Sequence, residues 1–361
     1  MEKLKIAVYA ICKNEAKFID RWMDSIEEAD MVVVTDTGST DDSVEKLESR
    51  GAIVYRVEIN PWRFDVARNM ALNFVPDDVD VCIMLDMDEV FEPGWREKIE
   101  KIWTPKTNRL QYLFTWSFNP DGSRGITFLA DKIHSRRGYR WVSAVHEHLK
   151  FYGPGLEVYA KEESIRINHY PDQTKSRGQY LPLLELTIKE DPNHDRNMHY
   201  LGREYMYYNM WDKCIETLKK HLSMPSATWK DERCASMRFI AKAYKGKGDR
   251  REAKNWLYKA IAEAPHLREP YIEMAQFAYE EQDWPTVYHM AEETLKIQDR
   301  TLSYLSQPFA WNETIYDLGA ISCYYLEMYH KSYEWAKKAL KINPNDVRLQ
   351  NNLKIIKLKV E

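Results

Sequence analysis

The sequence predicts an α/β domain followed by an all-α domain. From residue 4 to about 115, short apolar runs alternate with amphipathic segments, which predicts a mainly parallel sheet covered by helices on both faces. From about residue 190 onward the strand-like runs disappear and the periodicity becomes helical. Small residues then recur at repeat-like intervals. We therefore expect an α/β domain over residues 1–180 and a helical-repeat domain over residues 190–361.

Each element of the first domain follows from the spacing of its apolar residues. Short apolar runs indicate strands at residues 5–11, 31–34, 52–57 and 81–85. Helical spacing indicates helices at residues 15–28, 41–50 and 65–74. Asp41 and Asp42 suit the start of the second helix, because carboxylates are stabilised at a helix N-terminus.

The second half carries an irregular repeat. Gly202, Ala241, Ala275 and Ala320 are separated by 39, 34 and 45 residues. Other positions agree with the small, aromatic and proline positions of a tetratricopeptide repeat: Tyr205, Tyr244, Ala253, Leu257, Ala260, Pro265, Ala291, Ala336, Ala339 and Pro344. The longest step accommodates an insertion around residues 298–311. The alternative is a generic helical bundle, but stacked repeat units explain the agreement between copies better.

Composition limits the class of protein. The chain has 361 residues, a net charge of -4 and a pI of about 6.3, so it has no basic field that would recruit nucleic acid. Its five cysteines form no C-x-x-C pair, so we expect reduced thiols in the cytoplasm rather than disulfides or a zinc site. The chain enters a strand at once and has no apolar run of about 18 residues. We therefore expect neither a signal peptide nor a membrane span.

Three carboxylates follow the apolar run that ends at Leu85. Asp86, Asp88 and Glu89 fall within four positions, where a buried strand should leave the sheet. Such crowded carboxylates repel one another unless a cation neutralises them, and Mg²⁺ and Mn²⁺ prefer carboxylate oxygen while leaving sites for phosphates. The stretch thus suggests a metal-phosphate site. Taken alone, it would more often be a surface turn whose acids are solvated.

A second acidic position stands at the end of another strand. Asp36 is followed by a turn containing Gly38 and then by the expected helix, which Ser39 or Thr40 can cap. A carboxylate there can accept hydrogen bonds from a base or from ribose hydroxyls. Ligands of parallel sheets bind outside the carboxyl ends of the strands, so Asp36 and Asp86 should converge. Alone, this pattern is also that of an ordinary turn with an N-cap.

The order of these motifs resembles glycosyltransferase family 2, which has the GT-A nucleotide-sugar-binding fold. In that family a K-N-E-type turn, here at residues 13–15, precedes a D-x-G/S-S-T-D-D segment, here at residues 36–42. Residues 62–69 resemble the D-[FY]-x-x-A-R-N segment of bacterial members, with Val66 in the aromatic position, and residues 86–88 provide the D-x-D. The resemblance covers roughly residues 4–175.

The resemblance implies roles for the acids. Asp36 would bind the base or ribose of the nucleotide, Asp86 would face the ribose, and Asp88 would coordinate Mn²⁺ or Mg²⁺ on the diphosphate. Glu89 would help to orient them. The metal would stabilise the charge that develops on the departing nucleoside diphosphate.

Basic residues near these acids complete the implied donor site. Arg68 would pair with the nucleotide or with acidic groups, and Asp65 would hold Arg68 in place. The alternative for these two is an exposed i,i+3 pair worth only a few tenths of a kcal/mol. Lys132 belongs to a local basic cluster that would hold the diphosphate or an acidic acceptor, or form a solvated loop; its other members are His134, Arg136 and Arg137.

A V-H-E segment at residues 145–147 provides the candidate base. An inverting transfer needs a base that takes the acceptor proton, and Glu147 is the first candidate, with Asp131 as the fallback. Strand alternation would place His146 and His148 on one face and Glu147 on the other. Family members with a helical-repeat tail carry V-H-E followed by a later histidine, here His169, which would complete the metal shell. The alternative for His169 is a hydrogen-bonded turn residue.

Together these features predict a metal-dependent, inverting glycosyltransferase that uses a UDP-sugar. The pairing of a GT-A domain with a tetratricopeptide-like tail is similar to that of the sublancin-type peptide S-glycosyltransferases, so a peptide or protein side chain is the first acceptor to expect. The repeat tail would bind this acceptor or form a homodimer. Alternative acceptors are a cell-surface glycan and hydroxymethylated DNA, which the acidic net charge disfavours. A non-catalytic repeat scaffold is the rival of another class.

Overall fold

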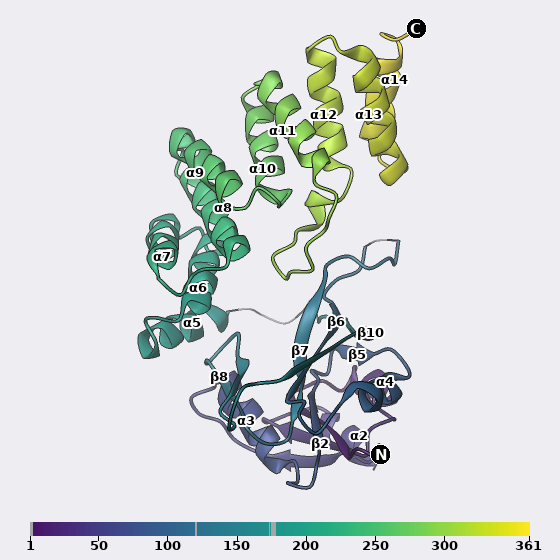
Figure 1. Ribbon diagram of the computed structural model, residues 1–361, viewed down its shortest axis with the longest axis vertical. Helices are drawn as coiled ribbons and strands as arrows, with labels where there is room; N and C mark the ends of the chain where they lie inside the picture. The colour runs from purple at the N-terminus through teal and green to yellow at the C-terminus, as the bar shows by residue number, and fades with distance from the viewer. Residues whose placement is uncertain (1–2, 120, 173, 175–177) are drawn as a thin grey trace. The chain divides into compact units, whose positions relative to one another are not determined.

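The computed structural model describes residues 3–119, 121–172, 174 and 178–361, which divide into two compact units. The first extends to Thr187 and includes Leu302–Tyr304, and the second contains Ile188–Thr301 and Leu305–Glu361. The first unit is built on a sheet and the second on helices, as Figure 1 shows. The fold class predicted from the sequence is therefore confirmed.

The sheet of the first unit has the strand order β3-β2-β1-β4-β7-β6-β10-β5. Its strands are β1 Ile6–Cys12, β2 Met31–Asp36, β3 Ile53–Arg56, β4 Val81–Met84, β5 Glu89–Phe91, β6 Arg109–Thr115, β7 Thr127–Ser135 and β10 Tyr159–His169. The first four pair in parallel, and β10 is parallel to β6, whereas β7 and β5 are antiparallel to their neighbours. A separate hairpin consists of β8 Tyr139–Val142 and β9 His148–Phe151.

Different elements pack on the two faces of the sheet. Apolar residues of α1 (Ile19–Ser25), α2 (Ser43–Ser49) and α4 (Trp95–Ile102) share one core cluster with β1 and β4. The other face packs against α3 (Phe64–Phe74) and the β8–β9 hairpin. Strand β4 is buried along its whole length, as expected for a strand covered on both sides. The hairpin and α3 thus lie on the same face of the sheet, so the hairpin segment can contact Arg68 of α3.

Two of the expected helices begin later than their apolar spacing suggested. The first starts at Ile19 because the residues after β1 form a turn in which Asn14 has a positive φ of 56°. The second starts at Ser43 because the Asp41 carboxylate accepts hydrogen bonds from the backbone N–H and the hydroxyl of Ser43. Both turns follow the carboxyl ends of strands. Their residues therefore form turns at that edge of the sheet instead of adding a first turn to each helix.

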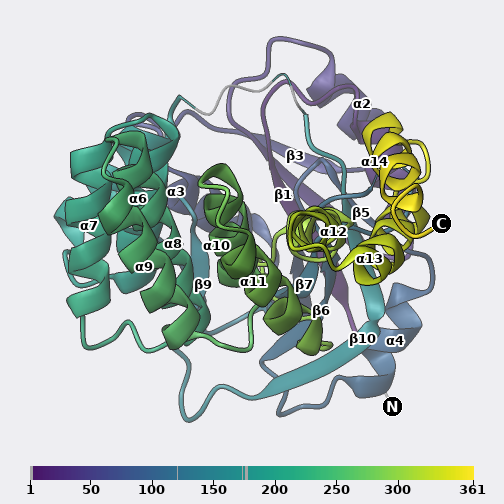
Figure 2. The ribbon, with the colours of Figure 1, turned by 90° about the horizontal axis from the view of Figure 1, so that it is seen from above.

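Helix pairs form the second unit. After α5 (Tyr180–Glu190), which spans the division between units, they are α6 Asp195–Tyr207 with α7 Trp211–Ser223, α8 Lys230–Gly246 with α9 Arg250–Glu263, α10 Glu269–Glu280 with α11 Trp284–Lys296, and α12 Thr314–Tyr325 with α13 Tyr329–Ile342, followed by α14 Val347–Lys357. Figure 2 shows α6 to α9 side by side, and each of these helices packs on the next.

Small residues lie where paired helices approach closely, as the repeat pattern predicted. A Cβ on Gly202 of α6 would overlap the Leu218 side chain of α7, and one on Gly319 of α12 would overlap Trp335 of α13. The insertion expected around residues 298–311 lies between α11 and α12 and includes the short helix η1, Pro308–Ala310. In the part of the chain that the structure describes, none of the helices combines the length and apolar character needed to cross a membrane.

Candidate functional site

The Asp36 carboxylate organises the turn at the end of β2. It is 2% exposed and accepts hydrogen bonds from the backbone N–H groups of Gly38 and Ser39 at 3.2 Å. Ser39 in turn accepts a hydrogen bond from the backbone of Asn14, whose side chain accepts one from the backbone of Thr40. A carboxylate offers about four acceptor positions, so Asp36 retains capacity for a ligand.

A hollow of about 480 Å³ opens beside this turn, between the ends of β2 and β3 and the start of α2. Asp36, Ser39, Arg56 and Glu58 are among its lining residues. Cys12 of β1 pairs with Asp36, and the backbone of Leu85 bonds to Tyr9, so Asp36 and Asp86 lie at the same edge, two strands apart. Two strand spacings amount to roughly 10 Å. The predicted convergence of these acids is thus reproduced.

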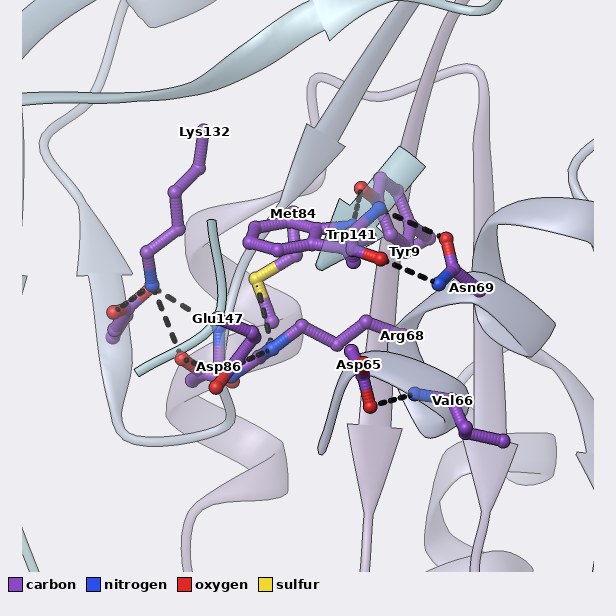
Figure 3. Close-up of polar contacts among 11 residues, drawn as sticks. Tyr9, Asp65, Val66, Arg68, Asn69, Met84, Asp86, Lys132, Trp141 and Glu147 are labelled. Carbon is purple, nitrogen blue, oxygen red and sulfur yellow. Dashed lines mark hydrogen bonds and ion pairs between the residues drawn. The ribbon is translucent and has the colours of Figure 1, made fainter. Parts of the chain in front are cut away.

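Asp86 lies between two cations. The Arg68 guanidinium donates to Asp86 Oδ1 at 2.8 Å and to Oδ2 at 3.3 Å, and Lys132 Nζ donates to Oδ2 at 3.1 Å (Figure 3). Lys132 also donates to Glu89 Oε1 at 2.6 Å, and Glu89 accepts from the backbone N–H of Asp86 at 3.1 Å. Through these contacts Glu89 fixes the turn after β4 and holds Lys132 against Asp86, which is a supporting position of the kind predicted for it.

These contacts determine the ionisation states of Asp86, Lys132 and Glu89. Burial by itself would raise the pKa of Asp86, but the charges of Arg68 and Lys132 hold its pKa well below the usual range. Burial likewise opposes the charge of Lys132, yet Asp86 and Glu89 raise its pKa above the ordinary lysine value. Burial raises the pKa of Glu89, and Lys132 opposes this shift only in part. Lys132 and Arg68 are thus permanent cations beside an ionised Asp86.

Asp88 stands apart from those cations and meets His169 instead. His169 Nε2 and Asp88 Oδ2 are 3.4 Å apart, and the other ring nitrogen, Nδ1, lies 3.2 Å from the carbonyl of Trp116. Because a carbonyl only accepts, Nδ1 carries a proton, and Nε2 is the nitrogen directed at Asp88. Burial would lower the pKa of His169, but the hydrogen bond to Asp88 and the charge of that carboxylate raise it. His169 ends β10, so it is a strand residue rather than a turn residue.

The Asp88–His169 pair has the donor chemistry for a divalent cation. Two adjacent ligands of an octahedral ion with bonds of 2.0–2.1 Å lie about 3 Å apart, close to the separation of these two atoms. The Trp116 carbonyl fixes the orientation of the ring, as the hydrogen-bond partners of metal-bound histidines do. Within the described ranges there is no cluster of three or more histidine, cysteine or acidic side chains that could hold a metal. An ion at this pair would therefore take its other ligands from phosphate and water, as Mg²⁺ usually does.

The predicted partnership of Asp65 with Arg68 is wrong. Asp65 pairs with Arg63, whose Nε and Nη2 donate to its two oxygens at 3.0 and 2.9 Å, and Asp65 also accepts from the backbone of Val66. An i,i+3 pair on the helix surface is wrong too, because the Arg68 side chain is only 9% exposed and points to Asp86. Asp65 thus fixes the first turn of α3, and Arg68 points to the Asp86 carboxylate instead of to Asp65.

Glu147 joins this group through Arg68. Arg68 Nε donates to Glu147 Oε1, so the same guanidinium contacts both Asp86 and Glu147. The strand alternation expected for residues 146–148 is wrong, because residues 143–146 form bends between β8 and β9 and His146 has a positive φ of 51°. His146 stacks on Tyr180, whereas His148 is the first residue of β9. This departure from a strand directs Glu147 to the site.

Asp131 lies in a different group. Arg109 donates to Asp131 Oδ1 at 3.0 Å and also meets Glu157 and the hydroxyl of Tyr159, both at 3.3 Å. Asp131 and Lys132 are adjacent on β7, and alternation along the strand separates their side chains. The structure thus brings Glu147, and not Asp131, into contact with the Asp86 group.

The basic residues near Lys132 do not form one cluster. His134 is fully buried and accepts a hydrogen bond from the hydroxyl of Tyr9, whereas Arg136 donates to the backbone carbonyls of Val75 and Pro76. Lys132 and His134 are two positions apart on β7 and share a face of the strand, whereas Arg136 and Arg137 follow its end. Of the four, only Lys132 bonds to the acidic residues Asp86 and Glu89. The expected basic cluster is therefore wrong.

The sequence reasoning missed two residues that hold this group together. Asn69 donates to the backbone carbonyl of Trp141 and accepts from its N–H, at 2.8 and 2.9 Å, so α3 is joined to β8. The Trp141 ring lies under the Arg68 guanidinium, 5.3 Å from its carbon, and its indole N–H donates to the hydroxyl of Tyr9 at 2.9 Å. The A-R-N segment contained a signal, because asparagine is disfavoured inside a helix and its amide is free to bond to another element.

Part of the sheet unit matches a known family model. Residues 7–108 match the model described as glycosyl transferase family 2, which confirms the resemblance seen in the motifs. An uncharacterised glycosyltransferase of Rickettsia bellii (strain RML369-C) is 34% identical over 110 residues, which cover 30% of this chain and 36% of that protein. The lipopolysaccharide core biosynthesis glycosyltransferase LpsC of Rhizobium meliloti (strain 1021) is 24% identical over 155 residues, which cover 40% and 57%. The chain thus spans well under two thirds of the length of these curated relatives.

Solved repeat proteins resemble the helical part of the chain. MamA is 17% identical with a TM-score of 0.37, over 46% of this chain and 89% of that structure. The C-terminal part of a TPR repeat-containing protein from Cytophaga hutchinsonii is 14% identical with a TM-score of 0.40, over 50% and 66%. The description of the second unit as a helical repeat rests on its own helix pairs and close approaches.

Proposed function

We propose that the protein is a metal-dependent glycosyltransferase that moves a sugar from a UDP-sugar to an acceptor nucleophile with inversion. The observation that carries this proposal is the convergence of Asp36, Asp86 and Asp88 at one edge of the sheet, with His169 beside Asp88. The match of residues 7–108 to glycosyl transferase family 2 supports it. Five buried free cysteines support the cytoplasm as its place of action.

The donor would bind across the ends of β2 and β4. Asp36 would accept hydrogen bonds from the base or ribose in the hollow beside β2, and Asp86 would face the ribose while Arg68 and Lys132 keep it ionised. Asp88 and His169 would hold Mn²⁺ or Mg²⁺ against the diphosphate. The bound ion supplies Lewis-acid stabilisation of the leaving nucleoside diphosphate.

The acceptor step needs a base, and we assign this role to Glu147. Its carboxylate would take the proton of the acceptor X–H while the X atom forms a bond to the anomeric carbon. The bond from that carbon to the diphosphate oxygen breaks, and the nucleoside diphosphate leaves with the electron pair. Glu147 then returns the proton to solvent. A positioned base of this kind contributes about 10²–10⁴-fold in rate.

The metal assignment is tested by incubating the protein with a panel of sugar nucleotides and Mn²⁺ or Mg²⁺ and measuring nucleoside diphosphate release. Asp88→Asn and His169→Gln should weaken the metal dependence, whereas Glu92→Gln should not, because Glu92 pairs with Arg124 and Asn168 outside this group. Metal-dependent release that is the same in Asp88→Asn and the wild type would refute the assignment. The absence of release with every donor in the wild type would favour the non-catalytic scaffold.

The base assignment is tested by comparing Glu147→Gln with Asp131→Asn. We expect the first to lower transfer by on the order of 10²–10⁴-fold while UDP still binds, and the second to retain transfer. The opposite ranking would move the base to Asp131.

For the acceptor we propose a peptide or protein side chain, because stacked helical repeats form extended binding surfaces. A cell-surface glycan is the second candidate, since the Rhizobium meliloti relative bears the name of a lipopolysaccharide core enzyme. Peptides, core oligosaccharides and hydroxymethylated DNA, each offered with the selected donor, would separate the three by which of them receives the sugar. The acidic net charge of -4 disfavours the DNA.

A further inference from the structure

One guanidinium lies between the carboxylate proposed to face the donor and the carboxylate proposed to activate the acceptor. Arg68 donates through Nη1 and Nη2 to the two oxygens of Asp86 and through Nε to Glu147 Oε1 (Figure 3). Met84 Sδ accepts a further contact from Nη1 at 3.0 Å, and the Trp141 ring lies 5.3 Å from the guanidinium carbon. The fork is therefore fixed on several sides.

We infer that Arg68 is a positioning residue of the transfer reaction, which sets the orientation of Glu147 relative to the donor carboxylate Asp86. The inference rests on the proposed function and gives Arg68 a role other than direct contact with the nucleotide. Through Arg68, the donor end and the acceptor end of the site share one rigid group.

The local structure explains why Arg68 can do this. Helix α3 is tied to the segment that carries Glu147 at two further points: the backbone N–H of Phe64 donates to the carbonyl of Ala144 at 3.0 Å, and Asn69 bonds to the backbone of Trp141. A planar guanidinium offers donors in fixed directions, so it can bridge two carboxylates at once. A lysine ammonium is a point charge on a flexible stem and cannot reproduce that bridge.

The two carboxylates depend on Arg68 to different degrees. Asp86 also receives Lys132 at 3.1 Å, so it keeps a cation when Arg68 is changed. Within the described ranges Glu147 has Arg68 as its one cationic partner. Loss of Arg68 should therefore disturb the acceptor step more than donor binding, which a merely structural role would not do.

Turnover and binding separate these effects. With UDP-glucose and Mn²⁺ as the probe, Arg68→Lys should lower kcat by about 100-fold, the order of loss that misplacement by about 1 Å brings. UDP affinity, measured by calorimetry, should change much less than kcat. Arg96→Lys is the matched control, because Arg96 is also largely buried and bonds to Asp30 and Glu100 near the opposite end of β1. An equal loss of kcat and UDP affinity, or an equal loss in the Arg96 variant, would overturn the inference.

Chemical rescue gives a readout that instability does not move. In Arg68→Ala, added guanidinium chloride at millimolar concentration should restore part of kcat, whereas equal sodium chloride should not. A loss of kcat without rescue would show that Arg68 only stabilises the fold.

A double-mutant cycle on unfolding keeps this test separate from the proposed function. Arg68→Lys and Glu147→Gln, singly and together, should show non-additive urea midpoints because the two side chains are in contact. Additive effects would remove the physical bridge and with it the inference. A non-additive cycle in a protein without any transfer activity would instead refute the proposed function and leave the bridge in place.

Discussion

Folding stability should fall in mild acid because His134 is buried as a neutral imidazole. Its Nδ1–H donates to the carbonyl of Ser135 at 2.8 Å, so Nε2 is the acceptor for the Tyr9 hydroxyl, also at 2.8 Å. The Tyr9 oxygen already accepts the indole N–H of Trp141. Protonation of Nε2 would leave the Tyr9 hydroxyl proton without its acceptor. Burial accordingly lowers the pKa of His134 from 6.5 to about 3.

The sign and size of the effect follow from linkage. Between pH 6.5 and 3 the unfolded chain binds a proton at His134 that the folded chain does not, so the free energy of unfolding decreases as the pH falls through 6.5. With these two pKa values, His134 alone removes about 2 kcal/mol between pH 8 and pH 5. Full burial makes solvent screening of this contribution small.

Urea unfolding at pH 8, 7, 6 and 5, followed by tryptophan fluorescence and circular dichroism, measures this effect. His134→Gln should lower stability at pH 8 but flatten the pH dependence by about 2 kcal/mol relative to the wild type, whereas the exposed His289→Gln should leave the dependence unchanged. Because the chain has two units, each transition is fitted separately. A His134 variant with the full wild-type pH dependence would refute the reasoning.

Three further predictions concern packing and buried charge. Gly202→Ala should cost about 1–3 kcal/mol by overpacking against Leu218, and a thermal midpoint equal to that of the wild type would show that the helices can separate at no cost. Lys132→Met should destabilise by about 3–5 kcal/mol because it leaves Glu89 buried without its cation, and adding Glu89→Gln should recover part of this in thermal unfolding; no recovery would contradict the pairing. Asn69→Leu, which cannot bond to the backbone of β8, should cost about 1–3 kcal/mol in urea unfolding, and no loss would mean that the helix and hairpin stay joined by packing alone.

Local sequence patterns predicted the secondary-structure elements but not the partners of the charged side chains. The buried strand before Asp86 and the turn at Asp36 were predictable, because a short apolar run and a glycine turn leave few conformations open. The close approaches at Gly202 and Gly319 were also visible as small residues in a repeat. The partner of Arg68 was not, since Glu147 lies 79 positions away and the i,i+3 rule favoured Asp65.

The missed features share one physical cause. Whether residues 146–148 continue a strand depends on the backbone at Ser143 and His146, which both adopt positive φ. Residues other than glycine seldom do so, and the sequence pattern did not indicate it. The basic residues around Lys132 have different partners because His134 is buried against Tyr9 of β1 and Arg136 lies beyond the end of β7, an arrangement that follows from the place of this strand between β4 and β6. The order of strands in a sheet depends on contacts between residues far apart in the chain, and local sequence patterns do not reveal it.

The charge balance of the site gives its acids different tasks. Asp86 and Glu89 share the ammonium of Lys132, and Asp86 and Glu147 share the guanidinium of Arg68. Each of these three carboxylates therefore already has a side-chain cation as its neighbour. Among the residues that the structure describes, the Asp88 carboxylate pairs only with His169, whose imidazole can give up its proton and become a ligand. A divalent cation would therefore meet less competition at Asp88 than at Asp86. On this argument the three acids after β4 are not equivalent ligands, and metal affinity should respond far more to Asp88→Asn than to Glu89→Gln when Mn²⁺ binding is titrated directly.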